Sequence, residues 1–530
     1  MKKRFIYEED YPVVQTKAGK LRGYVFDDMF IFQGVKYADA KRWQMPEPVA
    51  PWEGIKDATS YGPVCPTIGN PIPMGEVYIP HRFWPADEHC QYLNIWTTSL
   101  DSTIKKPVMV WFHGGGFSDG SSVEQVAYEG DALAKYGDVV SITINHRLNM
   151  LGFLDMPSFG EEYKNSGNVG LADIVAALQW VHDNIAAFGG DPDNVTVFGQ
   201  SGGGGKVQAL LQIPAAAGLF HKGILMSGVH KEPRDQVVDH HKLVCDMMEL
   251  LHIDPSHPEE FAQVPYQTLE KVYNRASYSL LKQGIFNSWG PVQDDWYLGD
   301  YSKVGFAEHA KTIPVIVGTV MAEFSDRNAY THPESMTEEE KLAEIQKSCK
   351  DQTDKAVALF RNAYPTHDIT RILHLDLNSR DAAVCFAGDK AAASSAPSYV
   401  YLFTPEFHMK GQTPAWHCAD IPFVFHNTER CPYTQIPGVT ERLEEEMCGA
   451  WIAFARTGNP NHPALKEWPA FTKEHKVTMV FDETSEAKED HDTELIAALQ
   501  QVMPKRDLSA MFLKMALKAG EESTGKAWLY

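Results

Sequence analysis

The sequence predicts an α/β fold in which a large, mostly parallel central sheet is flanked by helices, with helical insertions around it. Three observations predict it: compact apolar runs of strand length, an amphipathic helical pattern between two of them, and the resulting alternation of strand and helix. Such alternation needs right-handed crossovers, which leave successive strands parallel. Neither a repeat nor a Pro- or Gly-rich linker divides the 530 residues, so we expect residues 1–530 to form one domain.

The first half of the chain carries the clearest elements. Residues 12–60 have the pattern of short strands and turns, and apolar runs predict buried strands at 107–112 and 139–145. Apolar side chains then recur every three or four residues over 171–188, which predicts an amphipathic helix ended by Gly189 and Gly190. We expect the next elements to be a turn at 191–194, a strand at 195–198, a helix after Ser201 and a strand at 223–226.

The second half is less regular. We expect strands at 314–317, 399–403 and 477–481. Helical patterns are predicted near 238–252, 267–283, 337–363 and 438–457, and these strands interrupt the series of helices. Helical insertions around the sheet are the natural interpretation.

Composition and charge exclude several classes of protein. A hydrophobic content of 44% supplies a large core and excludes disorder. The net charge of −22 repels phosphate backbones and anionic membrane surfaces, so we expect no nucleic-acid partner. We expect no membrane span, because no apolar run reaches about 18 residues. The basic start, Met1 to Arg4, is not followed by the apolar stretch of a signal peptide, and this favours a cytoplasmic protein.

A GxSxG sequence, residues 199–203, lies between a predicted strand and a predicted helix. Such a turn thrusts its serine outward, and the flanking glycines avoid collisions with the strand and helix. Ser201 is therefore a candidate nucleophile. The alternative is a phosphate-binding loop, because Gly202 to Gly205 precede Lys206. That loop would need glycine at Gln200 and Ser or Thr at Val207, so the phosphate interpretation is disfavoured.

A second glycine motif, Gly114 to Gly116, follows the strand predicted to end at Phe112. Consecutive glycines leave backbone N–H groups free to turn toward one point, as an oxyanion hole requires. A plain glycine turn is the competing interpretation. The serine motif farther along the chain favours the oxyanion hole.

The chain resembles the type-B carboxylesterase and cholinesterase family of α/β-hydrolases over nearly its whole length. Besides the two glycine motifs, the resemblance rests on segments that occur in the same order along the chain. They are Phe32 to Val35 with Tyr37 and Ala38; Tyr92 to Trp96; Asn145 to Arg147; and Trp451, Phe454, Ala455, Thr457 to Pro460, Trp468 and Pro469.

The resemblance implies a catalytic triad of Ser201, Glu323 and His417. Serine is a weak nucleophile, so the imidazole must take its proton, and a carboxylate must fix the imidazole tautomer and stabilise the imidazolium. The family places the acid five residues after a glycine that ends a strand. It places the histidine three residues before an acidic residue, which is followed by a strand-like apolar run, here 423–425. Asp294 and Asp326 remain rival acids.

The resemblance also implies an oxyanion hole formed by the N–H groups of Gly115, Gly116 and Gly202. Phe286, Trp289 and Phe324 are candidates for the acyl pocket, although buried aromatic residues are more often plain core. Two departures stand out near the serine. Gln200 replaces the usual glutamate of relatives, and Gly202 replaces their commoner alanine.

A disulfide between Cys65 and Cys90 is implied only by the resemblance. The eight cysteines contain no CxxC pair, so no zinc or thioredoxin-type site is suggested. The predicted reducing compartment argues against the disulfide. The pairing therefore stays a hypothesis.

The resemblance implies a broad-specificity carboxylesterase for small or aromatic uncharged esters, acting through an acyl-enzyme without metal or cofactor. Trp84 invites comparison with the cation-binding tryptophan of cholinesterases, but its distance from Cys90 differs, which disfavours choline esters. A lipase-like preference for long acyl chains and a catalytically silent adhesion protein are the alternatives. The sequence leaves the oligomeric state open.

Overall fold

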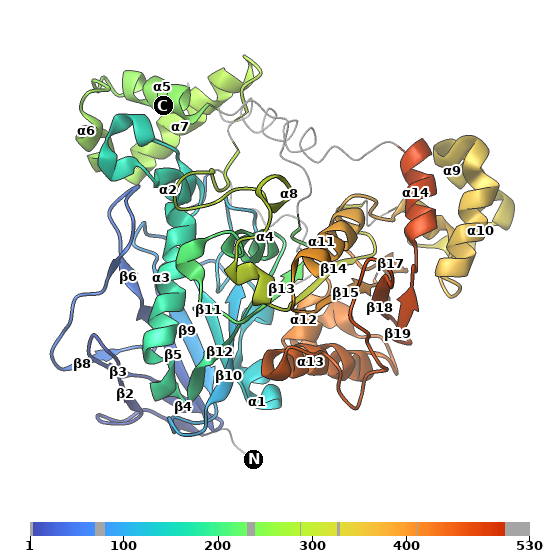
Figure 1. The fold of residues 1–530 in the computed structure, drawn as a ribbon, viewed down its shortest axis with the longest axis horizontal. Helices are drawn as coiled ribbons and strands as arrows, with labels where there is room; N and C mark the ends of the chain where they lie inside the picture. Colours follow the sequence, from blue (N-terminus) through green and yellow to red (C-terminus); the bar gives the residue numbers. More distant parts are fainter. Residues whose placement is uncertain are drawn as a thin grey trace.

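In the described part of the chain, twelve strands form one central sheet (Figure 1). The computed structural model describes residues 4–68, 80–229, 239–286, 288–325, 329–409 and 411–503. The strands, in spatial order, are β1 (Phe5–Ile6), β4 (Tyr24–Phe26), β5 (Met29–Lys36), β9 (Tyr92–Thr97), β11 (Val140–Ile144), β10 (Lys106–Phe112), β12 (Gly190–Gln200), β13 (Lys222–Met226), β14 (Val315–Val320), β15 (Ser398–Phe403), β18 (Val477–Phe481) and β19 (Glu486–Glu489).

The strands from β11 to β18 are parallel, and the strands outside them pair antiparallel. The predicted fold class is therefore confirmed. Along β10, Val108, Val110 and Phe112 enter one hydrophobic cluster, whereas Met109 and Trp111 enter another. Successive side chains of a strand point to opposite faces, so both faces of this sheet are buried. Burial on both faces explains the continuous apolar run that predicts this strand.

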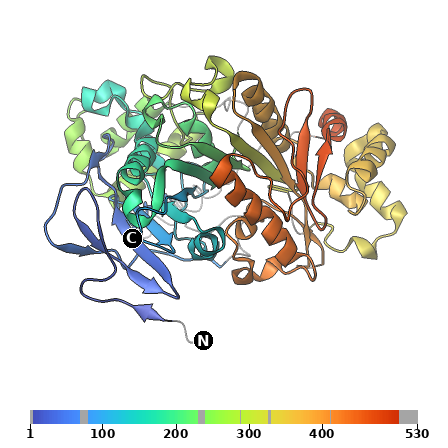
Figure 2. The same cartoon turned by 60° about the horizontal axis from the view of Figure 1, so that its bottom comes forward.

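Helices cover both faces of the sheet (Figures 1 and 2). Three of them contribute to the cluster of Val108: α3 (Val169–Asn184), α4 (Gly202–Leu210) and α11 (Ser379–Ala393). Three others contribute to the cluster of Trp111: α1 (Asp131–Gly137), α12 (Ile421–Val424) and α13 (Thr440–Thr457). The long helix predicted from 171 is thus found as α3, and its last predicted turn is a 3-10 segment, Ile185–Phe188.

Two further groups of helices lie at opposite ends of the molecule in Figure 1. One group comprises α5 (His240–Leu250), α6 (Pro258–Gln263) and α7 (Tyr266–Leu281), and the other comprises α9 (Glu338–Cys349), α10 (Thr353–Ala363) and α14 (Thr493–Val502). The helix predicted over 337–363 is two helices, because the chain turns at Lys350, where φ is 52°. Among the described residues, none of the helices is both long and apolar enough to cross a membrane.

The remaining elements are short. They are β2 (Val13–Gln15), β3 (Lys20–Arg22) and β8 (Ile55–Asp57) in one small sheet, the pairs β6 (Ala38–Asp39) with β7 (Glu47–Pro48) and β16 (Glu406–Phe407) with β17 (Thr413–Pro414), and the helices α2 (Asn149–Phe153) and α8 (Tyr301–Val304). Of these elements, the five strands from β2 to β8 that are named here confirm the short strands predicted over 12–60.

Two local predictions need correction. The turn predicted at 191–194 lies inside β12, where the register with β10 shifts between the pairs Lys106–Gly190 and Val108–Val195. The run 423–425 was predicted to be strand-like and this is wrong, since α12 begins at Ile421 with Pro422 in its first turn. A short apolar run buried on all sides has the same appearance in a strand and in a helix.

Candidate active site

Ser201 occupies the single position between β12 and α4. Its backbone has φ 58° and ψ −124°, a conformation that is costly for a residue with a Cβ. Its N–H donates to the Met226 carbonyl at 2.8 Å, and its carbonyl accepts from the Gly205 N–H at 3.0 Å. A Cβ on Gly203 would lie 2.0 Å from the Phe112 carbonyl oxygen, so the motif requires glycine there. The turn is thus held from both sides.

Glu323 and His417 lie in direct contact, 94 residues apart in the chain. The Nδ1 of His417 donates to Oε2 of Glu323 at 2.5 Å, and the His417 backbone N–H donates to the Glu323 carbonyl at 2.9 Å. The other carboxylate oxygen accepts the Val320 N–H at 3.0 Å. The carboxylate is fully buried, so it fixes the imidazole with Nε2 directed away from the acid.

The serine turn and the histidine loop touch through their flanking residues. The Cys418 thiol donates to the Gln200 side-chain oxygen at 3.2 Å, and these residues directly follow His417 and precede Ser201. Among the described residues, Nε2 of His417 has no hydrogen-bond partner, so it is not bonded to the Ser201 hydroxyl in this structure. This bond is often long in free hydrolases and tightens when substrate binds.

Asp294, one of the two rival acids, does not lie against His417. The Asp294 carboxylate accepts from the side-chain amides of Asn165 and Asn168 at 2.8 and 2.9 Å and from the Trp296 backbone at 2.9 Å. These bonds engage both of its oxygens away from His417. Asp326 lies outside the described residues.

The glycine loop packs directly on the serine turn. Gly115 and Gly116 have φ of 84° and 65°, in the left-handed region that favours glycine. A Cβ on Gly202 would lie 2.2 Å from the Gly116 carbonyl oxygen, which explains why alanine is absent from position 202 in this chain. The backbones of the three predicted oxyanion-hole residues are therefore neighbours.

Comparisons with known proteins show the family to which the chain belongs. A model of the carboxylesterase family matches residues 10–498. The chain belongs to this carboxylesterase family. Para-nitrobenzyl esterase of Bacillus subtilis (strain 168) is 33% identical over 501 residues, which cover 91% of this chain and 97% of that protein. Phenmedipham hydrolase of Pseudarthrobacter oxydans is 32% identical over 503 residues, which cover 90% and 97%.

A solved structure supports the same assignment. An esterase from the anaerobe Clostridium hathewayi that can hydrolyse aliphatic aromatic polyesters is 46% identical to this chain. The match has a TM-score of 0.91 and covers 95% of this chain and 100% of that chain. The protein is thus a carboxylic ester hydrolase with the α/β-hydrolase fold.

Lys206 is not among the site residues that we predict from the sequence of this carboxylesterase. It is fully buried in α4, and its Nζ donates to the His113 carbonyl at 2.9 Å, directly before the glycine loop. Burial lowers the pKa of Lys206 to about 7. The rings of His113 and His146 stack 5.2 Å apart beside it, and burial, aided by Lys206, holds the pKa of both imidazoles well below the usual range.

The signal for Lys206 was present in the sequence. The helix after Ser201 begins with four glycines and continues with Val207, which is typical of a helix packed closely on all sides. A lysine in such a helix must be paired with a polar group, because burying an unpaired amine is costly. This constraint favours a structural role for Lys206 over one in a phosphate-binding loop.

The three predicted pocket aromatics differ in their surroundings. The ring of Phe324 lies 4.1 Å from the His417 ring and exposes 39% of its surface. Trp289 is half-buried against Tyr273, at 5.5 Å, and its neighbour Gly290 approaches Phe117 of the glycine loop. Phe286 is half-buried just after α7. Phe324 is therefore the aromatic residue in direct contact with the candidate site.

A buried acid lies behind Glu323 in the esterase. Asp420 is fully buried, and one of its oxygens accepts the Tyr401 hydroxyl at 2.8 Å. Burial, with the nearby Glu323 charge adding to it, raises the pKa of Asp420 to about 7. Its folded state thus holds a proton that the unfolded chain releases near pH 4.

We expect Asp420→Asn to stabilise the esterase more at pH 8 than at pH 5. Between about pH 4 and 7 this carboxyl group ionises in the unfolded chain but stays protonated in the folded protein. The free energy of unfolding therefore falls as pH rises through this range, by on the order of 4 kcal/mol for this group. Asparagine keeps an acceptor for Tyr401 and does not ionise. Melting temperatures of both proteins at the two pH values measure the difference. An equal shift at both values would contradict the assignment.

Cys65 and Cys90 are free thiols in this structure, as are the other six cysteines. The two belong to one cluster of buried residues, and burial together with the neighbouring Cys65 raises the pKa of the Cys90 thiol. The Cys65 sulfur also accepts the Leu148 N–H at 3.2 Å. We expect a thiol titration of the denatured esterase to count eight thiols both before and after reduction. A count of six before reduction would show that the pair is bonded.

Proposed function

We propose that the esterase cleaves small or aromatic uncharged esters through an acyl-enzyme on Ser201. His417 takes the serine proton as the ester carbonyl is attacked and then gives it to the leaving alcohol, while Glu323 stabilises the imidazolium. Water, activated by the same imidazole, then releases the acid. The observation that carries the proposal is the 2.5 Å contact between Nδ1 of His417 and Glu323, beside a serine held in a strained turn.

We propose that Gly115, Gly116 and Gly202 donate their N–H groups to the oxyanion. The left-handed backbone of the first two and the close approach of the third to Gly116 support this role. Donors arranged before the reaction stabilise the negative charge without reorganising, and each is worth about 3–4 kcal/mol in the barrier.

The preference for aromatic esters rests on two kinds of support. Phe324 presents a partly exposed ring against the His417 imidazole, where the ring of an aryl ester could stack. Relatives are named for para-nitrobenzyl and phenmedipham substrates, and the Clostridium hathewayi esterase can hydrolyse aliphatic aromatic polyesters.

We also propose a reducing, cytoplasmic location. The eight cysteines, all free thiols in this structure, support it.

Labelling with a fluorophosphonate, followed by peptide mapping, tests the nucleophile. We expect one label per chain, on the peptide containing Ser201, and loss of esterase activity in proportion to labelling. A label on another residue, or full activity in the labelled enzyme, would contradict the proposal. Rates with aryl esters of increasing acyl length then test the substrate class, because a lipase-like enzyme would prefer the longest chains.

Lys206→Met should lower kcat by about 10- to 100-fold with little change in KM. Its Nζ positions the His113 carbonyl, and small displacements of groups beside the reacting atoms have effects of this size. Steady-state kinetics with an aryl acetate measure both constants. Lys390→Met is the matched control, since Lys390 is also buried and donates to a backbone carbonyl, that of Ile313, at 2.9 Å. Equal losses of kcat in the two variants would show a merely structural role for Lys206.

A further inference from the structure

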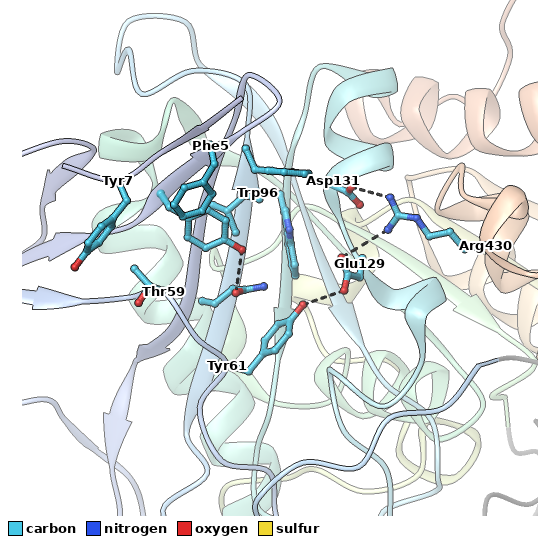
Figure 3. Close-up of a pocket in the computed structure, with 12 residues that line it drawn as sticks. Phe5, Tyr7, Thr59, Tyr61, Trp96, Glu129, Asp131 and Arg430 are labelled. Carbon is cyan, nitrogen blue, oxygen red and sulfur yellow. Dashed lines mark hydrogen bonds and ion pairs between the residues drawn. The ribbon is translucent and has the colours of Figure 1, made fainter. Parts of the chain in front are cut away.

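A cavity lies among the N-terminal strands, apart from the candidate active site (Figure 3). Its volume is about 870 Å³, which is within the range of small-molecule sites. Strands β1, β4, β5 and β9 supply lining residues, whereas Ser201 follows β12. In the sheet, β11 and β10 separate β9 from β12, a distance of about 14 Å at the usual strand spacing. The cavity is therefore distinct from the site of Ser201.

Half of the lining is aromatic. The rings belong to Phe5, Tyr7, Tyr24, Phe26, Tyr61 and Trp96. Single exposed rings are common on protein surfaces, but Phe5, Tyr7 and Phe26 expose 62%, 44% and 37% of their surfaces around one cavity. The Phe5 and Tyr24 rings lie 5.5 Å apart at an angle of 33°, so part of the wall is a tilted pair of aromatic rings. Such walls favour a flat, ring-shaped ligand.

The charges at the far end of the cavity are compensated. Arg430 lies 2.7 Å from Asp131 and 3.6 Å from Glu129, and Arg82 lies 2.7 Å from Glu129. Each carboxylate that lines the cavity is thus paired with a guanidinium group. A charged ligand would have to disrupt these pairs, whereas an uncharged ligand leaves them in place.

The polar groups nearer the rings are neutral. The Tyr24 hydroxyl donates to Gln33 at 3.1 Å, and the Tyr61 hydroxyl donates to Glu129 at 3.3 Å. Burial raises the pKa of Tyr24 to about 12 and also raises that of Tyr61, so both remain un-ionised at neutral pH. The amide of Gln33 and the hydroxyl of Thr59 complete the polar lining.

We propose that this cavity is a second binding site, for an uncharged aromatic molecule with one or two rings and a hydrogen-bonding group, such as a phenol or an aryl ester. The rings provide stacking surfaces, and the amide and hydroxyl groups provide hydrogen bonds. We assign to the cavity binding alone and no chemical step.

Equilibrium dialysis of the full-length esterase with 2-naphthol tests the proposal. The protein is first inactivated with a fluorophosphonate, and the residual esterase activity is measured, so that a failure of the Ser201 assignment is recognised separately. We expect one naphthol to bind per chain after inactivation. Phe5→Ala and Tyr7→Ala should each weaken binding about five- to tenfold. Phe83→Ala should not, because Phe83 is 68% exposed and outside the lining.

The charge preference gives a second test. The anion 2-naphthoate and a naphthylmethyl-trimethylammonium cation should both bind more weakly than 2-naphthol. Arg430→Gln removes the guanidinium partner of Asp131, whereas Glu129 keeps Arg82, so the variant should raise the affinity for the cation relative to 2-naphthol. The proposal is overturned by the absence of naphthol binding to the inactivated enzyme, by binding that Phe5→Ala and Tyr7→Ala leave unchanged, or by equal binding of 2-naphthoate.

Discussion

Ser201→Ala should lower kcat/KM for an aryl ester by about 10⁴- to 10⁶-fold, the range found when a hydrolase loses its nucleophile. Without the hydroxyl no acyl-enzyme forms, and the remaining rate comes from substrate binding and the oxyanion donors alone. The substitution removes one oxygen atom and leaves the turn between β12 and α4 in place. Burst kinetics and steady-state turnover of the purified variant measure the effect.

A matched control separates this effect from a loss of structure. Ser398 is a buried serine on β15, away from the serine turn, and we expect Ser398→Ala to keep nearly full turnover. The circular dichroism of both variants should match that of the unmodified esterase. Retention of substantial activity by Ser201→Ala would show that another group attacks the ester.

Glu323→Gln should reduce kcat by up to about 10⁴-fold, the loss expected when the group that orients a catalytic histidine becomes neutral. The amide has nearly the same shape, but an NH₂ group facing His417 cannot accept the hydrogen bond from Nδ1–H, and the neutral amide no longer stabilises the imidazolium. Steady-state kinetics of the purified variant with an aryl ester measure the loss.

The rival acids provide the controls for this substitution. Asp294→Asn should keep most of the turnover, because Asp294 is engaged by Asn165 and Asn168. If Glu323→Gln were fully active, the role of the acid would pass to Asp326, which has the same chemistry three residues farther along the chain.

The central elements of the fold could be predicted because their signals are local. The apolar run of β10, the periodicity of α3 and the glycines around Ser201 each reflect burial or a backbone requirement within a few residues. Glu323 and His417 have no such local signal. They were assigned from the spacing that the family resemblance implies, and the structure brings these two side chains together.

Features that depend on distant contacts could not be predicted. The run 423–425 has no pattern that separates a buried strand from a buried helix, and the break at Lys350 interrupts an otherwise continuous helical pattern. Lys206 gains its role from a carbonyl 93 residues earlier in the chain. The cavity in Figure 3 joins the N-terminal strands to Arg430.

A crystal structure of the fluorophosphonate-labelled esterase tests the central claim most directly, because the bound phosphonyl group imitates the tetrahedral intermediate. We predict phosphorus bonded to Oγ of Ser201, its oxygen within about 3 Å of the N–H groups of Gly115, Gly116 and Gly202, and Nε2 of His417 within hydrogen-bonding distance of the serine oxygen. A label whose oxygen points away from the three glycines, or an imidazole turned away from residue 201, would contradict the account.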